Sequence, residues 1–290
     1  PSGFYETRRR AVEALAALGA HDVLREFLRR PRDISDPVEL TGEEAVINAA
    51  ARALGTLGDP GDLPLLLSLL QQKSTAGVIE AVGKYRRMEA LPFLIEALAE
   101  DFYRPAAENA MRALGARARA ALMKTAVHCR MAFGRETSAS VLRRRSALAL
   151  LREFGLPRNW PWRTLPGLLR DPDPQIATFA CGLALGLATV PEVLQLEAAQ
   201  RLVALLPLAD GLLSAEIEDC LVEKFAIAKS LVADAIAAER RVQPSPREWP
   251  DHRVLSALLR IEARANFMHD EPPSARGHAK HDKQRDAAGK

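Results

Sequence analysis

Residues 51–70 read ARALGTLGDPGDLPLLLSLL, and this stretch predicts two short helices joined by a turn. Apolar residues recur at spacings of three and four on each side of the turn, which is the period of one helix face. The faces before and after the turn hold, respectively, Val46, Ala50, Leu54 and Leu57, and Leu63, Leu66, Leu67 and Leu70. Within the turn, Gly58 suits a helix exit, Asp59 a helix cap and Pro60 a first helical position.

The same pattern of small residues, leucine and glycine recurs along the chain. The copies are AVEALAALG (11–19), AAARALGTLG (49–58), GVIEAVGKYR (77–86), AENAMRALG (107–115), ALALLREFG (147–155) and ATFACGLALG (177–186). Their last residues lie 39, 28, 29, 40 and 31 residues apart, which indicates a period near 30 with two insertions of about ten residues. Because one short helix pair cannot bury its apolar face alone, we expect the pairs to stack around a continuous core.

Helix starts are predicted from capping residues. Thr41 and Glu44 have the spacing of a capping box, with Thr41 as the N-cap. Asp173 is placed to cap a later helix that Pro174 opens.

The pattern at 51–70 resembles HEAT repeats of the short, phycobilisome-lyase-like class, and the resemblance extends over about residues 5–206. It implies an all-α fold, namely a right-handed, armadillo-like α-solenoid (a superhelix) of about six HEAT-like helix pairs. The class includes bilin lyases, hydroxylases, assembly factors and plain binding scaffolds. The resemblance therefore implies an architecture more than an activity.

Four regions are expected along the chain. Residues 1–211 form the repeat array, 212–243 a degenerate repeat or C-terminal helical cap, 244–268 a linker and an amphipathic helix, and 269–290 a disordered tail. The amphipathic helix could dock on the array or bind a partner. The chain begins PSGFYETRRR without a methionine, which indicates a processed chain or a segment of a longer polypeptide.

Composition narrows the class of protein. Apolar residues make up 48% of the chain and aromatic residues 5%, a balance typical of close-packed helices. No apolar run reaches the length of about 18 residues that a membrane span needs. Cys129, Cys181 and Cys220 are far apart and are expected to be buried thiols in a reducing compartment, which favours a cytoplasmic location.

Positive charge is concentrated in one part of the chain. Residues 102–170 hold fourteen Lys/Arg and three Asp/Glu, whereas residues 36–101 and 171–243 each hold five and eleven. Arginine dominates, which favours bidentate recognition of carboxylate or phosphate. The candidate binding residues, here called the basic band, are Arg104, Arg112, Arg117, Arg119, Lys124, Arg130, Arg135, Arg143, Arg144, Arg145, Arg152, Arg158, Trp160, Trp162 and Arg163.

Three interpretations of the basic band stay open. It could pair with acidic residues of neighbouring repeats, hold an acidic segment of a partner protein, or bind nucleic acid. Residues 128–140 are expected to be a mobile loop that carries Arg130 and Arg135. Residues 157–166 place Trp160 and Trp162 beside arginines, where they could stack on a base, anchor a peptide or pack on the helices beneath.

Catalytic and metal-binding patterns are not found in the sequence. No histidine is followed by glutamate, so the His-Glu iron ligands of repeat-built hydroxylases are missing, and no Gly-rich phosphate loop is present. This chain also resembles HEAT-like DNA glycosylases in architecture. Their chemistry needs a tryptophan and an acidic residue that meet in the groove, and the local candidates for these roles are Trp160, Trp162, Asp171 and Asp173. A bilin-lyase-like role is a further, weaker alternative.

The sequence therefore favours a non-catalytic protein–protein interaction scaffold without cofactor or metal, which holds an acidic partner segment on the basic band. Nucleic-acid binding is the alternative. Reversal of Arg143, Arg144 and Arg145 to glutamate is expected to abolish salt-sensitive binding and to leave helicity intact.

Overall fold

The computed structural model describes residues 2–30, 34–156, 162–241 and 252–270, and these residues are almost entirely helical. The all-α class predicted from the sequence is confirmed. In the first half of the chain the α-helices are α1 (Ser2–Ala17), α2 (His21–Arg29), α3 (Pro37–Leu57), α4 (Leu63–Gln72), α5 (Ala76–Lys84), α6 (Leu91–Ala97), α7 (Arg104–Leu114), α8 (Arg119–Val127) and α9 (Ser138–Phe154). In the second half they are α10 (Leu165–Leu169), α11 (Pro174–Gly186), α12 (Glu192–Leu205), α13 (Gly211–Glu223), α14 (Phe225–Glu239) and α15 (Arg253–Asp270).

Short 3₁₀ turns and one hairpin connect several of these helices. The 3₁₀ turns are η1 (Pro60–Asp62), η2 (Met88–Ala90), η3 (Gly115–Ala118), η4 (Trp162–Thr164) and η5 (Leu206–Leu208). Among the described residues the strands are β1 (Met131–Ala132) and β2 (Arg135–Glu136), an antiparallel pair in which Met131 faces Glu136 and Ala132 faces Arg135.

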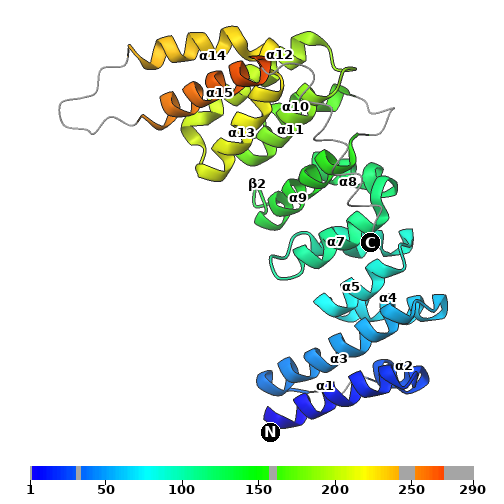
Figure 1. The fold of residues 1–290 in the computed structure, drawn as a ribbon. Coiled ribbons are helices and arrows are strands. Elements are labelled where there is room, and N and C mark those ends of the chain that lie inside the picture. Colours follow the sequence, from blue (N-terminus) through cyan, green and yellow to red (C-terminus); the bar gives the residue numbers. More distant parts are fainter. Residues whose placement is uncertain (1, 31–33, 157–161, 242–251, 271–290) are drawn as a thin grey trace. The chain divides into compact units, whose positions relative to one another are not determined.

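The chain divides into two compact units, residues 1–160 and residues 161–290. In the first unit α1 packs on α3, α3 on α5 and α5 on α7, so alternate helices lie side by side in chain order (Figure 1). The shorter helices α2, α4 and α6 pack beside them, and α8 packs on α9. The apolar core of this unit follows these contacts and includes Leu24, Leu54, Leu66, Ile79, Leu94, Met111, Leu122 and Leu148.

In the second unit α11 packs on α12 and α13, and α15 packs on both α13 and α14. The amphipathic segment expected near the C-terminus is therefore a helix docked on its own chain, with Ala257, Leu258, Ile261 and Ala265 buried. Residue 211, where the repeat pattern fades in the sequence, lies inside this unit and begins α13. The expected tail lies outside the described residues after residue 270.

The turn at 58–60 forms as predicted. Gly58 ends α3 in the left-handed region with φ 71°, and the Asp59 carboxylate accepts a hydrogen bond from the backbone N–H of Gly61. The first five copies of the repeated pattern each end at a residue with positive φ, namely Gly19, Gly58, Arg86, Gly115 and Gly155. Arg86 has a positive φ of 51° without being glycine.

The predicted apolar faces are buried with two differences. Val46, Ala50 and Leu54 are buried in α3, but Leu57 is 41% exposed because it is the last residue of the helix and adjoins an exposed turn. In α4 the buried set is Leu63, Leu66, Leu69 and Leu70, so Leu69 takes the place expected for Leu67.

The capping box expected at Thr41 is wrong. Helix α3 begins four residues earlier, at Pro37, and the Asp36 carboxylate accepts hydrogen bonds from the backbone N–H groups of Val38 and Glu39 at 2.9 and 2.8 Å. The Thr41 hydroxyl instead donates to the Pro37 carbonyl within the helix. An Asp-Pro pair is the stronger start signal, because the carboxylate caps and the proline fits the first turn. The predicted cap Asp173, which precedes Pro174, forms in the same way.

The structure differs from the expectation of three buried thiols. Cys181 and Cys220 are buried, but Cys129 is exposed because it follows the end of α8 and precedes the hairpin. Burial raises the pKa of the Cys181 thiol to about 12. Helices long and apolar enough to cross a membrane are not found among the described residues.

We therefore expect alkylation of the native protein to modify one cysteine. Iodoacetamide at pH 7.5 should label Cys129, because thiolate is the reactive form and the other two thiols are buried. Intact mass should show a single adduct in the native protein and three after denaturation, and Cys129→Ser should remove the native adduct. Labelling of Cys181 as fast as Cys129 would contradict the packing of α11.

Candidate functional site

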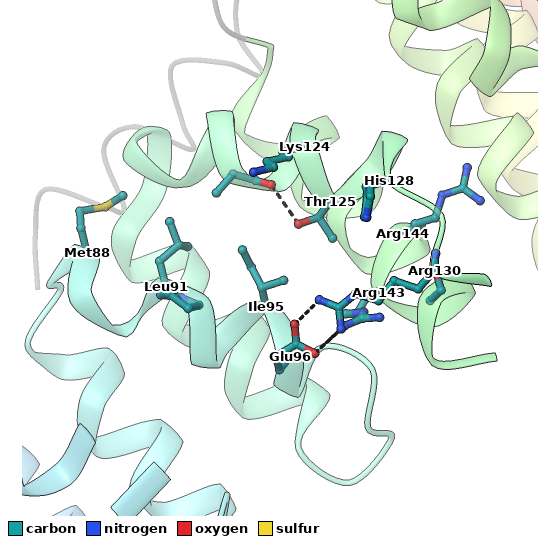
Figure 2. Close-up of a pocket in the computed structure, with 13 residues that line it drawn as sticks. Met88, Leu91, Ile95, Glu96, Lys124, Thr125, His128, Arg130, Arg143 and Arg144 are labelled. Carbon is teal, nitrogen blue, oxygen red and sulfur yellow. Dashed lines mark hydrogen bonds and ion pairs between the residues drawn. The ribbon is translucent and has the colours of Figure 1, made fainter. Parts of the chain in front are cut away.

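A pocket of about 480 Å³ lies in the first unit between α6, α8 and α9 (Figure 2). One end is apolar and is formed by Met88 of η2 and by Leu91, Pro92 and Ile95 of α6. Leucine and isoleucine four residues apart share one side of a helix, so Leu91 and Ile95 form one continuous wall. This end can accept an aliphatic or aromatic side chain.

The opposite end of the pocket is cationic. Arg130 donates to both oxygens of the Glu96 carboxylate, at 2.9 and 2.5 Å, and Arg143 donates to one of them at 2.5 Å. Glu96 follows Ile95 on α6, so the carboxylate lies where the apolar wall meets the two guanidinium groups (Figure 2). The pocket therefore combines an apolar end with a site that already holds a carboxylate.

A third arginine that lines the pocket, Arg144, is buried. Its guanidinium donates to the Ala126 carbonyl at 2.8 Å, in the last turn of α8, and to the Glu136 carboxylate at 2.7 Å. Glu136 also accepts from the Ser140 hydroxyl at 2.6 Å. These contacts tie α8, β2 and α9 together, so they hold the cationic end of the pocket in place.

The segment 128–140, expected as a mobile loop, contains the hairpin instead. Its turn residues Phe133 and Gly134 both have positive φ, at 51° and 75°. At its base the Thr137 N–H donates to the Arg130 carbonyl at 3.0 Å, and the Arg130 N–H donates to the Ser140 hydroxyl at 2.9 Å. The hairpin thus fixes the backbone of Arg130 next to the start of α9.

Positive charge exceeds negative charge around the pocket. Lys124 and His128 line it from α8 and the residue after it. Among the described residues Lys124 forms no ion pair, while Glu96 is shared by two arginines and Arg144 pairs with Glu136. Among the described residues, the cationic side chains that line the pocket are Lys124, Arg130, Arg143 and Arg144, and the carboxylates of Glu96 and Glu136 bond to the three arginines. The site is therefore suited to an additional anionic group.

The hydrogen bonds from Arg130, together with the charge of Arg143, lower the pKa of Glu96 below its ordinary value of 4.5. The folded protein thus favours the charged Glu96 carboxylate more than the unfolded chain does. The ion pairs of Glu96 therefore contribute their full stabilisation above pH 4.5, and this stabilisation is lost as the pH falls through the pKa of Glu96 in the folded protein.

We accordingly expect the stability difference between the wild type and Glu96→Gln to be constant near neutral pH and to shrink below about pH 4.5. Urea unfolding of both proteins between pH 3 and 7 measures it. A difference that grew as the pH fell would contradict the ion pairs at Glu96.

The remaining residues of the basic band do not gather at this pocket. Arg112 pairs with Glu153 at 2.8 Å, and Arg104 pairs with Asp101. Arg117 donates to the Arg86 carbonyl at 2.7 Å, and Arg119 donates to the Phe154 carbonyl. Much of the predicted band is therefore engaged with neighbouring helices of its own chain.

The structure places the other predicted residues as follows. Arg135 is exposed on the hairpin, and on α9 Arg145 is half-buried and Arg152 is exposed. Arg163 is exposed on η4, in the second unit, where Trp162 begins the turn. Arg158 and Trp160 lie outside the described residues. The four residues of the band that the pocket brings together are Lys124, Arg130, Arg143 and Arg144.

Sequence reasoning missed the α6 side of the pocket. Leu91, Ile95 and Glu96 all fall outside the candidate binding residues predicted from the sequence. No local pattern marks this side, because Glu96 lies 34 residues before Arg130 and 47 before Arg143.

Groups of three or more His, Cys, Asp or Glu side chains that could hold a metal ion are not found in the part of the chain that the structure describes. Asp171 and Asp173, considered for base-directed chemistry, have local structural roles. Asp171 accepts from the Asp173 N–H at 2.9 Å, and Asp173 caps α11 by accepting from the Ile176 N–H at 3.0 Å.

Comparison with models of known protein families, with curated proteins and with solved structures found no match to this chain. The fold and the site therefore define an all-α protein with an amphipathic, cationic pocket, and its function is argued from that pocket.

Proposed function

We propose that this protein is a non-catalytic binding scaffold, built as a HEAT-like helical repeat array, that holds an acidic segment of a partner protein in the pocket between α6, α8 and α9. The observation that carries the proposal is the pocket itself. An apolar wall of Met88, Leu91 and Ile95 ends at a cationic site that Lys124, Arg130 and Arg143 line.

Contacts between residues that are 28 or 29 positions apart in the sequence support the repeat array. Arg52 pairs with Glu80 and Lys84 donates to the Thr56 hydroxyl, each across 28 residues. The Gly77 N–H donates to the Asn48 side chain across 29 residues. These separations lie within one residue of the 28-residue distance between the second and third copies of the sequence pattern, as expected if equivalent positions of stacked units touch. A right-handed superhelix of about six such units is part of the proposal.

The longer intervals between copies also have matching contacts. Arg25 donates to Asp62 across 37 residues at 2.5 Å, and Arg112 donates to Glu153 across 41 residues. The corresponding copies are 39 and 40 residues apart. The insertions therefore lengthen connections between units without changing which faces meet.

An acidic peptide suits the pocket better than a nucleic acid. Nucleic-acid binding relies on many cations that are available to phosphates along a strand. Here Arg104, Arg112, Arg117 and Arg119 are already bonded to carboxylates or carbonyls of the chain. A partner with one or two carboxylates beside an apolar side chain would use both ends of the pocket.

Selection from a random peptide library tests this proposal. A library of twelve-residue peptides is displayed on phage and selected on the immobilised full chain, in parallel with the double variant Lys124→Glu/Arg130→Glu. Both substituted side chains are exposed, so the variant should fold. We expect peptides with Asp or Glu close to Leu, Ile or Phe to be enriched on the wild type, and this enrichment to vanish on the variant.

Two results would overturn the proposal. One is enrichment of peptides without acidic residues, or equal enrichment on the charge-reversed variant. The other is binding of labelled single- or double-stranded DNA or RNA at micromolar affinity or tighter, with a steep loss between 50 and 200 mM salt, which would favour the nucleic-acid alternative.

A further inference from the structure

We infer that, in the free protein, the Glu96 carboxylate occupies the site on Arg130 and Arg143 at which a carboxylate of the partner binds. The partner's acidic side chain then binds by replacing Glu96 on these two arginines. This inference rests on the proposed function and specifies its ligand, a peptide segment with a carboxylate beside a bulky apolar side chain. The free protein then carries its own substitute for the ligand's charge.

The burial of the three partners supports exchange at this position. The Arg143 side chain is 5% exposed, whereas the Glu96 and Arg130 side chains are 54% and 50% exposed. A buried guanidinium needs an anion at all times, because an unpaired buried charge is costly. The anion that Arg143 has is on an exposed side chain, which can turn into solvent and remain hydrated when another carboxylate arrives.

The neighbouring arginine provides a contrast on the same helix. Arg144 and Glu136 are 3% and 16% exposed, and Glu136 also accepts from Ser140. Arg144 bonds a backbone carbonyl as well. Both side chains of that pair are largely buried and the pair is part of the fold, whereas the Glu96 and Arg130 side chains are half exposed at the pocket.

The position of Glu96 in the sequence defines the ligand further. Ile95 and Leu91 precede it on α6 and form the apolar end of the pocket, so the carboxylate site and the apolar wall are adjacent. A partner segment that places its carboxylate on Arg130 and Arg143 has its neighbouring side chain at this wall. Lys124, on the facing helix, supplies a cation for a second carboxylate.

Glu96→Gln tests the inference, with Glu89→Gln as the matched control. Glu89 is exposed on η2, and its ion-pair distance to Arg87 is long, at 3.9 Å, so the control removes the same charge without altering the site. The same peptide library is selected on the wild type and both variants, and dissociation constants are measured for the enriched peptides at 50 mM salt.

We expect Glu96→Gln to bind acidic peptides about fivefold more tightly than the wild type, because the competing carboxylate is gone and an exposed ion pair such as Arg130–Glu96 contributes on the order of a factor of five. Glu89→Gln should bind within about twofold of the wild type. Glu96→Gln should also melt at a lower temperature than the wild type and gain more from added peptide, because Arg143 regains its anion.

Unchanged or weaker peptide binding by Glu96→Gln would overturn the inference, since Glu96 would then support the site and not occupy it. If the wild type still binds acidic peptides and Lys124→Glu/Arg130→Glu does not, the proposed function stands without the exchange. If neither the wild type nor Glu96→Gln enriches acidic peptides, both proposals are wrong.

Discussion

Gly55→Ala should lower the free energy of unfolding by about 2 kcal/mol, although alanine is the better helix former. Gly55 is in α3, and a Cβ atom at this position would lie 2.6 Å from Cα and 2.8 Å from Cβ of Ala81 in α5. The Cα and Cβ atoms of Ala81 cannot move without shifting helix α5. The gain in helix propensity, about 1 kcal/mol, is therefore smaller than the cost of separating the two helices.

Gly167→Ala is the matched control, because it makes the same substitution in helix α10 at a position where a Cβ would have no atom within 4 Å. It should leave stability unchanged or raise it by up to about 1 kcal/mol. Urea unfolding followed by far-UV circular dichroism measures both variants. A stabilising effect of Gly55→Ala equal to that of Gly167→Ala would contradict the close contact of α3 and α5.

Arg144→Ala should destabilise the protein by about 3 kcal/mol. The substitution leaves the Glu136 carboxylate without its cation and removes a hydrogen bond to the last turn of α8. Removal of one partner from a buried ion pair typically costs a few kcal/mol, because the remaining charge stays poorly solvated.

Arg135→Ala on the hairpin is the control, since its side chain is exposed and its loss should change stability by less than about 0.5 kcal/mol. Equal effects of the two substitutions would show that Arg144 does not hold α8, β2 and α9 together. Burial of Arg143 and Arg144 also corrects the sequence-based expectation that Arg143 to Arg145 could be reversed without loss of helicity. Glutamates at the two buried positions would face the carboxylates of Glu96 and Glu136.

The helical fold could be predicted from the sequence because its signals are local. The spacing of leucines in 51–70, the exit at Gly58 and the Asp-Pro starts at Asp59 and Asp173 depend on a few adjacent residues. The exit and both starts form, and the predicted apolar faces are buried except at Leu57 and Leu67. The copies of this pattern are related by contacts at matching separations, such as Arg52 with Glu80. The error at Thr41 arose where two local start signals competed and the Asp-Pro pair prevailed.

The candidate site was predicted less completely because its residues meet only in three dimensions. Charge counting identified Lys124, Arg130, Arg143 and Arg144, but it could not separate them from Arg112 or Arg119, which bond to neighbouring helices. The Glu96 carboxylate comes from a different helix pair, 34 residues before Arg130 and 47 before Arg143. No spacing rule within one helix relates these positions.

Methyl NMR of the full chain, labelled at its methionine and isoleucine methyl groups, tests the central claim most directly. An acidic peptide enriched in the library selection is added to the protein, and resonances of Met88 and Ile95 in the pocket are compared with those of Met111, which is fully buried. We predict that the Met88 and Ile95 signals shift with peptide concentration, that Met111 does not, and that the shifts vanish in Lys124→Glu/Arg130→Glu. Peptide binding that shifts other methyl groups and leaves Met88 and Ile95 unchanged would contradict the assignment of the pocket as the binding site.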